Sequence, residues 1–269
     1  MPIEQDTLNR STWSTRSSRR WLDSVGGFTD PGERVVLELL RDRIRDAPVL
    51  DLGVGTGRTI PLFRALTSDY RGVDYLPSMV EACRRRYQSV RVDVGDARDL
   101  DGVPSRHFAV VYFSFNGIDA VDHEGRARVL DEMRRVVRDD GVVSFSTLNL
   151  RGPAYRERPW SWRVAPARHP ALRAIRAARA LSMMPIETVR WSRLRTRSVS
   201  GDGWAIAPLS AHGYGVLAHF TTLERQLADL EEARLDRDVV VIESDRGEQV
   251  RPGDDTSNAA WLHFIARPR

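Results

Sequence analysis

Residues 49–58 read Val49-Leu50-Asp51-Leu52-Gly53-Val54-Gly55-Thr56-Gly57-Arg58, an apolar run followed by glycine at three alternate positions. The run has the composition of a buried strand, and a helix is expected to begin directly after the glycines. Glycine lets a ligand approach the backbone closely at such a turn. In an open α/β sheet this turn lies at the carboxyl ends of the strands, where ligands bind. The stretch therefore predicts an α/β fold with a ligand at its first loop.

Two kinds of nucleotide cofactor use a loop of this form. The dinucleotide fingerprint is Gly-x-Gly-x-x-Gly, and counting from Gly53 its third glycine falls on Arg58. The order here is Gly-x-Gly-x-Gly. Because glycine loops tolerate variation, this difference alone leaves both cofactor types open.

Short apolar runs alternate with amphipathic segments after the loop, which predicts a doubly wound, mostly parallel sheet with helices on both faces. The expected strands are residues 49–52, 70–73, 89–92, 108–113 and 142–147. The expected helices are residues 58–66, 77–87 and 124–137. Asp139-Asp140-Gly141 should end the last of these helices.

The alternation of apolar runs and amphipathic segments returns near the C-terminus. A helix is expected after Thr221, followed by strands at 238–243 and 260–266. The link between these two strands is too short for a crossover helix, so they should pair antiparallel.

The segment between these two regular parts differs in composition. Residues 151–200 hold twelve Arg and two acidic residues. Its prolines are expected to interrupt any long regular element, although residues 171–181 read as a helix. We therefore expect four parts: an N-terminal helical cap (1–45), a cofactor-binding core (46–150), an inserted lid for substrate recognition (151–218) and a C-terminal part of the core (219–269).

Acidic residues follow the second and third expected strands. Asp74 ends the second, where a carboxylate can accept both hydroxyls of a ribose, and Gly95-Asp96-Ala97 follows the third. The fourth strand leads into Ser114-Phe115-Asn116. Together with the glycine loop, these features resemble the class I S-adenosylmethionine-dependent methyltransferases, a family with a seven-stranded, Rossmann-like sheet. The resemblance covers residues 45–150 by motif and 219–266 by pattern.

The resemblance implies S-adenosyl-L-methionine as the cofactor and a role for each matching position. Asp51, Gly53, Gly55 and Gly57 would contact its methionine moiety, Asp74 its ribose, and Asp96 its adenine amino group. The remaining expected cofactor contacts are Tyr75, Met79, Ala97, Phe113 and Ser114. Val54 stands where the family often has an acidic or small residue. An ordinary helix cap or turn remains the alternative reading of Asp74 and Asp96.

Methyl transfer depends first on collinear placement of the reacting groups, so the sequence need not contain an obvious catalytic residue. A general base is needed only when the acceptor loses a proton. We select His212, Asn116 and Asp119 as candidates, with His212 preferred because it ends the insertion beside the acceptor side. His123, His169 and His219 are further candidate bases, and a structural histidine is the alternative for each.

The insertion is expected to select the substrate, since loops at the carboxyl edge of such a sheet carry function. Tryptophans and fixed cations suit a small acceptor that is anionic, aromatic or apolar. The expected substrate-binding residues are Trp160, Trp162, Arg173, Arg176 and Tyr214. The arginine stripe is at least as compatible with a solvated lid helix.

The sequence thus predicts a methyltransferase that acts on O, N or C of a small molecule. A nucleic-acid methyltransferase and a non-catalytic cofactor-binding protein are the alternatives, and a dehydrogenase is a more distant one. The first has the basic segment in its favour, but Ser-Phe-Asn-Gly at 114–117 lacks an aromatic motif for stacking a flipped base. We expect no metal ion, nucleic acid or membrane as partner. The single cysteine, Cys83, indicates a reducing, cytoplasmic setting. The oligomeric state stays open, a homodimer included.

Overall fold

The structure is a computed structural model that describes residues 2–24, 27–161, 170–211 and 213–269. Its strands are β1 (Val49–Leu52), β2 (Tyr70–Asp74), β3 (Arg91–Val94), β4 (Phe108–Phe113), β5 (Val137–Asn149), β6 (Val199–Gly201), β7 (Trp204–Leu209), β8 (Val216–Thr221), β9 (Arg237–Glu243), β10 (Gln249–Val250) and β11 (Trp261–Arg267). Its helices are α1 (Pro2–Trp13), α2 (Arg16–Ser24), α3 (Pro31–Ile44), α4 (Ile60–Arg64), α5 (Pro77–Arg86), the 3-10 helix η1 (Gly117–Ala120), α6 (His123–Val136), α7 (Pro153–Arg156), α8 (Pro170–Arg195) and α9 (Leu223–Glu232).

The central sheet has the order β3-β2-β1-β4-β5-β11-β9, and β10 extends its β9 edge. The first five of these strands run parallel. Strand β11 pairs antiparallel with both β5 and β9, which confirms the predicted pairing at the C-terminus. The α/β fold class and the mostly parallel sheet are therefore as the sequence predicts.

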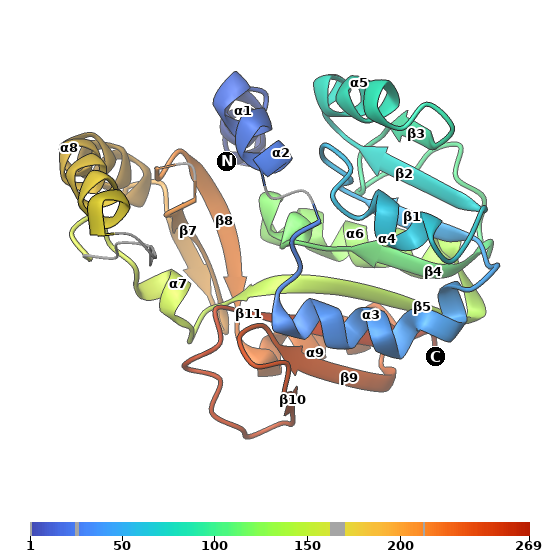
Figure 1. Cartoon of the computed structure of the whole chain (residues 1–269). Coiled ribbons are helices and arrows are strands. Elements are labelled where there is room, and N and C mark those ends of the chain that lie inside the picture. Colours follow the sequence, from blue (N-terminus) through green and yellow to red (C-terminus); the bar gives the residue numbers. More distant parts are fainter. Residues whose placement is uncertain (1, 25–26, 162–169, 212) are drawn as a thin grey trace.

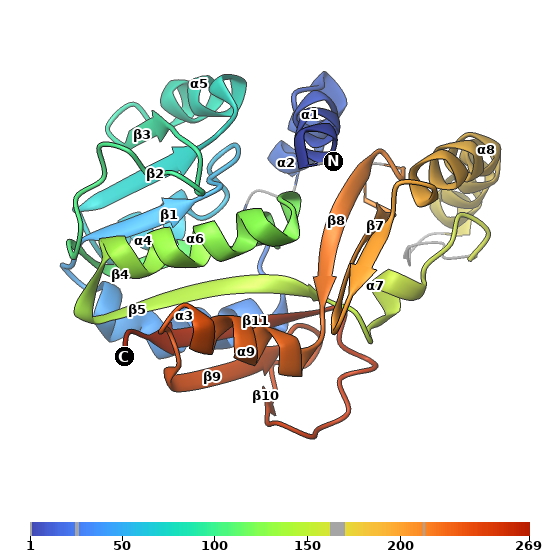
Figure 2. The same ribbon diagram turned by 180° about the vertical axis from the view of Figure 1, so that it is seen from behind.

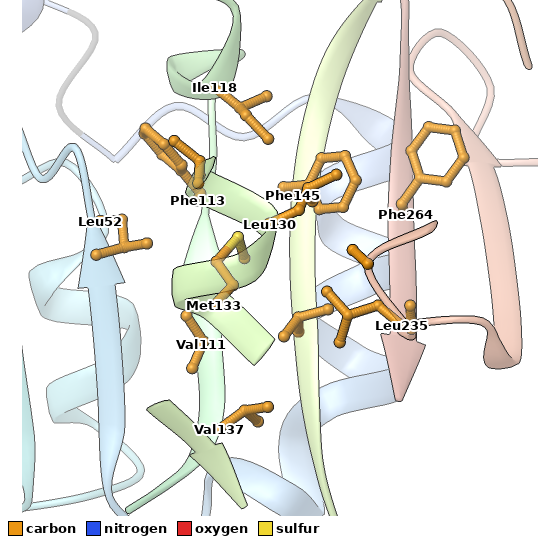
Figure 3. Packing of buried hydrophobic residues seen from close by; sticks show 14 of the residues in the cluster. Leu52, Val111, Phe113, Ile118, Leu130, Met133, Val137, Phe145, Leu235 and Phe264 are labelled. Carbon is orange, nitrogen blue, oxygen red and sulfur yellow. The ribbon is translucent and has the colours of Figure 1, made fainter. Parts of the chain in front are cut away.

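Two helical layers cover the sheet (Figures 1 and 2). On one face α6 and α9 bury Val129, Met133 and Leu230 against the strands, and Figure 3 shows the centre of this cluster. On the other face α3, α4 and α5 bury residues such as Leu40 and Phe63. The apolar side chains of α6 recur at helical spacing, and Asp122 caps the helix by accepting the Gly125 N–H (2.7 Å).

A second, smaller β-unit stands away from the central sheet (Figure 1). Strand β8 pairs parallel with the last two residues of β5, Leu148 with Phe220 and Asn149 with Thr221. Strand β7 pairs antiparallel with β8, and β6 with β7. This unit was not predicted, because its strands have only three to six residues and begin where the arginine-rich segment (151–200) ends.

Several predicted boundaries are wrong. Asp139-Asp140-Gly141 does not end the helix: α6 ends at Val136, and these residues lie inside β5. The reason is a bulge between β4 and β5, where a Cβ on Gly141 would lie 2.9 Å from the Ala109 carbonyl oxygen. Strand β3 begins at Arg91 rather than residue 89, because Val90 closes a turn onto the Tyr87 carbonyl (3.1 Å).

The predicted helix 171–181 is also too short. Helix α8 runs for 26 residues and contains Pro185, which was expected to interrupt it. Proline removes one main-chain donor from a helix. Here the carbonyl deprived of its partner belongs to Leu181, whose residue is 52% exposed, so water can replace the missing bond. Trp191 and Leu194 are buried at the far end of α8 and anchor it.

The N-terminal segment contributes to two places. Helix α3 packs against β4, β9 and β11, whereas α1 contacts β8. In Figure 1, α1 and α2 lie between β8 and the edge of the sheet that carries β2 and α5. Among the described residues, no helix is both long and apolar enough to cross a lipid bilayer.

Candidate functional site

A cavity of about 450 Å³ lies at the carboxyl ends of the parallel strands. Most of the predicted cofactor contacts line it: Gly53, Gly55, Asp74, Tyr75, Met79, Asp96, Ala97, Phe113 and Ser114. Asp51 and Gly57 are not among the lining residues. The structure thus brings together side chains from the ends of four different strands, as the topology of an open α/β sheet requires.

The glycine loop has the backbone that its sequence suggests. Gly53, Gly55 and Gly57 all adopt positive φ (62°, 56° and 90°), a region that favours glycine. A Cβ on Gly53 would lie 2.5 Å from the Phe113 ring, whereas one on Gly55 would meet nothing closer than 3.8 Å. The third glycine serves packing, because a Cβ on Gly57 would lie 2.5 Å from the Tyr87 ring.

Asp74 ties the glycine loop to the second strand. Its carboxylate accepts the Gly55 N–H and the Leu76 N–H, both at 2.9 Å. Burial raises the pKa of Asp74 to about 6, although these two hydrogen bonds oppose the shift. Each carboxylate oxygen has a second lone pair, so the group can still accept hydrogen bonds from a ligand.

Asp51 lies beneath the loop. It accepts hydrogen bonds from the Tyr70 hydroxyl (2.8 Å) and from Thr59, and burial raises its pKa to about 6. Its Oδ1 atom is buried without a partner among the described residues. This position supports the loop from below, and direct contact with a cofactor stays a prediction.

Two arginines hold Asp96. Arg98 donates to both carboxylate oxygens (2.6 and 2.9 Å), and Arg10 of α1 donates to one of them (3.1 Å). Burial alone would raise the pKa of Asp96, but the Arg98 hydrogen bonds and the two nearby cations lower it. The Arg10 guanidinium also lies 4.4 Å from the centroid of the Tyr75 ring. Helix α1 therefore reaches the end of the cavity where the adenine is expected.

The segment after β4 forms the floor of the cavity. Phe115 and Asn116 adopt positive φ (55° and 58°), and the Asn116 N–H donates to the Ser146 hydroxyl (2.8 Å). The Asn116 Oδ1 and the Tyr75 hydroxyl line the cavity and are buried without a partner among the described residues. Such polar atoms require a ligand or water.

A buried ion pair fixes this floor from outside. Arg58 binds both carboxylate oxygens of Glu33 on α3 (2.6 and 2.7 Å) and also donates to the Ser114 hydroxyl (2.8 Å). Arg58 and Glu33 are 8% and 1% exposed. The residue in the third fingerprint position is thus a structural cation, which places α3 against the glycine loop.

Asp119 lines the cavity, but both of its carboxylate oxygens already accept hydrogen bonds from neighbouring residues. It pairs with Arg126 and accepts the Thr147 hydroxyl and the Leu148 N–H, both at 2.7 Å. Burial raises its pKa to about 6, against the effect of Arg126. This geometry favours a structural role over that of the predicted catalytic base.

The predicted histidines lie apart from the cavity or cannot be placed. His212 and His169 fall outside the described residues. His123 and His219 contact each other (3.2 Å between Nδ1 and Nε2) and stack with Trp204, and neither lines the cavity. Burial strongly lowers the pKa of His219, so this ring is neutral.

The predicted substrate residues lie elsewhere too. Trp162 falls outside the described residues. Trp160 is 54% exposed and packs edge-on to Trp191, while Tyr214 is buried outside the cavity lining. Arg173 and Arg176 are exposed on α8, which lies on the outer side of the β6–β8 unit in Figure 1. Neither arginine lines the cavity.

Other residues form the end of the cavity away from the glycine loop. They are mostly apolar and come from α7, β7, β8, the turns beside these elements and the start of β11: Pro153, Ala154, Glu157, Leu209, Ser210, Ala211, Val216, Leu217, Ala218 and Trp261. The sequence analysis missed this set. One signal was present, because Glu157 is one of two acidic residues in a segment of twelve arginines.

Comparison with known proteins identifies a methyltransferase domain in part of the chain. Residues 49–141 match a family model described as a methyltransferase domain. A curated protein of Saccharopolyspora spinosa, dTDP-4-amino-2,3,4,6-tetradeoxy-D-glucose N,N-dimethyltransferase, is 31% identical over 106 residues. That match spans 39% of each protein, so the chain aligns with about two fifths of its curated relative.

Solved structures show the same fold. The 1,6-didemethyltoxoflavin-N1-methyltransferase of Burkholderia thailandensis, solved with S-adenosylhomocysteine, is 16% identical with a TM-score of 0.61, over 100% of this chain and 90% of that one. DesVI of Streptomyces venezuelae is 15% identical with a TM-score of 0.59, over 95% and 99% of the two chains. The glycine loop, the acidic residues at the strand ends and these matches lead to one conclusion: residues 49–141 form a methyltransferase domain, within a chain that has the fold of S-adenosylmethionine-dependent methyltransferases.

Proposed function

We propose that this protein binds S-adenosyl-L-methionine in the 450 Å³ cavity and transfers its methyl group to a small, largely apolar acceptor at the other end. The observation that carries the proposal is the continuity of the cavity. One end is built from Gly53, Gly55 and Asp74, and the other from apolar residues such as Leu209 and Leu217. A donor and an acceptor can therefore meet within one cavity.

The polar groups of the cavity fit the cofactor. Asp74 retains lone pairs for the ribose hydroxyls, and Gly55 leaves open space for a ligand to pass. We assign the adenine to the region of Tyr75, Asp96 and Ala97. When bound, the cofactor would supply an electrophilic methyl group on a cationic sulfur.

The chain contributes position and exclusion of water to this reaction. Phe113 lies close against Gly53, and the Asn116 N–H donates to Ser146, so both residues have defined positions in the floor of the cavity. Fixed placement of two reactants can lower a barrier by about 7 to 11 kcal/mol. A general base is required only if the acceptor loses a proton, and His212 and Asn116 remain predictions.

Nitrogen is the acceptor atom that the comparisons favour, because the Saccharopolyspora spinosa relative is by name an N,N-dimethyltransferase. Transfer to oxygen or carbon stays open. A cavity of about 450 Å³ with mostly apolar walls suits a small molecule better than a nucleic acid, whose flipped base needs a wide approach and stacking partners.

Cofactor binding is the first test. S-adenosylhomocysteine at a hundredfold excess over its Kd should raise the melting temperature by about 5 to 10 °C. Replacement of Asp74 by alanine should abolish most of this shift, whereas Asp69→Ala on the surface should not. No shift at millimolar ligand would refute the proposal. A screen of small acceptors by mass spectrometry, for the gain of one methyl group, then tests turnover.

A further inference from the structure

Glu157 stands out among the residues at the acceptor end. It directly follows α7 and is partly buried, and the Ser210 hydroxyl donates to its Oε2 at 2.5 Å. Ser210 directly follows β7, so two segments 53 positions apart place a hydroxyl and a carboxylate together on an otherwise apolar wall.

The other carboxylates of the cavity are compensated. Asp6 and Asp96 pair with Arg10 and Arg98, and Asp119 pairs with Arg126. Asp74 accepts two main-chain N–H groups.

Glu157 is the exception. Within residues 2–24, 27–161, 170–211 and 213–269, no cation forms an ion pair with its carboxylate. The neighbouring Arg158 donates instead to the main-chain oxygens of Tyr155 and Glu157 (2.9 and 2.8 Å).

We propose that Glu157 is the specificity-determining residue for the acceptor and binds the N–H groups of an amine, with Ser210 fixing the carboxylate. This inference rests on the proposed function and names its substrate class, a small, largely apolar molecule that carries a primary or secondary amine. A partly buried carboxylate without a cation gains most from a charge-assisted hydrogen bond to its ligand.

The same geometry argues against an anionic acceptor. The arginines that suggested one, Arg173 and Arg176, lie outside the cavity lining, and Arg98 is held by Asp96 and Asp6. An anion at the acceptor end would meet Glu157 without a described cation to offset it.

The test uses the full chain saturated with S-adenosylhomocysteine and three probes of matched size: benzylamine, benzyl alcohol and benzoate. Isothermal titration at neutral pH should show that benzylamine binds about tenfold more tightly than benzyl alcohol. In Glu157→Gln this preference should disappear, while the affinity for benzyl alcohol stays unchanged. In Ser210→Ala the preference should fall by about threefold.

Glu187→Gln is the matched control, because Glu187 is the other acidic residue of the arginine-rich segment and does not line the cavity. It should keep the preference for the amine. The wild-type ranking needs no variant, so a folding defect cannot mask the result. Tighter binding of benzoate than of benzylamine, or equal preference in wild type and Glu157→Gln, would overturn the inference. Loss of S-adenosylhomocysteine binding in the wild type would instead count against the proposed function.

Discussion

The Asp74 carboxylate both holds the glycine loop in place and keeps the capacity to accept hydrogen bonds from a ligand. Its two main-chain hydrogen bonds hold Gly55 and Leu76, yet burial raises its pKa to about 6. The pKa of Asp74 is higher in the folded protein than in the unfolded chain. Protonation of Asp74 therefore stabilises the folded protein fully below about pH 4, and this stabilisation is lost as the pH rises through about 6. The ionised form, which accepts ribose hydroxyls best, therefore predominates only above pH 6.

This titration predicts a pH-dependent cofactor affinity. As pH falls below 6, Asp74 becomes protonated, so the Kd of S-adenosylhomocysteine should be about tenfold higher at pH 5 than at pH 7. Isothermal titration across this range measures the effect. Asp74→Asn should bind weakly at both pH values and lack this step. An identical pH profile in wild type and variant would show that another group is responsible.

Asp119 should matter for stability before it matters for chemistry. Replacement by asparagine would leave Arg126, which is 2% exposed, without its counter-charge. A buried pair broken in this way costs about 3 to 5 kcal/mol of unfolding free energy, which urea denaturation can measure. Glu124→Gln, on the surface of the same helix as Arg126, is the control and should change little. A stable but inactive Asp119→Asn would restore the catalytic interpretation.

Gly53 should tolerate no side chain. The methyl group of an alanine there would lie 2.5 Å from the Phe113 ring, and the alanine would have to adopt a φ of 62°. Gly53→Ala should therefore destabilise the protein by about 2 to 3 kcal/mol and weaken S-adenosylhomocysteine binding. Gly102→Ala separates the two causes, since Gly102 has a φ of 72° but no neighbour within 4 Å, and it should cost about 1 kcal/mol. Equal costs in thermal denaturation would argue against the Phe113 contact.

At the scale of elements, Asn9 is one of several side chains that attach α1 to the β6–β8 unit. Asn9 is 1% exposed, donates to the Leu217 and Ala120 carbonyls (2.8 and 2.9 Å) and accepts the Leu217 N–H (3.1 Å). The next residue, Arg10, reaches Asp96. Asn9 therefore connects the acceptor side of the cavity with the adenine side.

Loss of this attachment should loosen α1. In Asn9→Ala, hydrogen exchange of residues 2–13 should accelerate by about tenfold or more, because three buried hydrogen bonds are removed. The Kd of S-adenosylhomocysteine should rise at the same time. Ser11→Ala is the control, since Ser11 is exposed and bonds only within its own helix turn, to Leu8. Unchanged exchange in Asn9→Ala would mean that other contacts hold α1.

Elements with a local pattern could be predicted from the sequence. The helix from His123 to Val136 and the strand from Phe108 to Phe113 follow from apolar spacing that a short window contains. Helix α8 could not, because its passage through Pro185 depends on solvent at Leu181 and on the buried Trp191. Strands β6 to β8 are stabilised mainly by pairing with each other, which no single segment reveals.

At the scale of the whole molecule, the sequence predicts one half of the cavity and not the other. Asp74 and Asp96 follow strands at motif spacing, so their place at the carboxyl edge could be inferred. Arg10 contacts Asp96 across 86 positions of the sequence, and Glu157 contacts Ser210 across 53. The arginines of residues 151–200 suggested an anionic substrate, but Arg173 and Arg176 lie outside the cavity lining. Composition alone does not show where the side chains of α8 lie relative to the cavity.

The thin connection between the small β-unit and the main sheet has a consequence for how such proteins diversify. Only the final two positions of β5 join the unit to the rest of the sheet in the described residues. New recognition surfaces can therefore be grafted at this junction while the donor-binding half keeps its strand register. One scaffold can in this way serve many different molecules, with change concentrated in a module that contains neither the glycine loop nor the acidic residues at the strand ends.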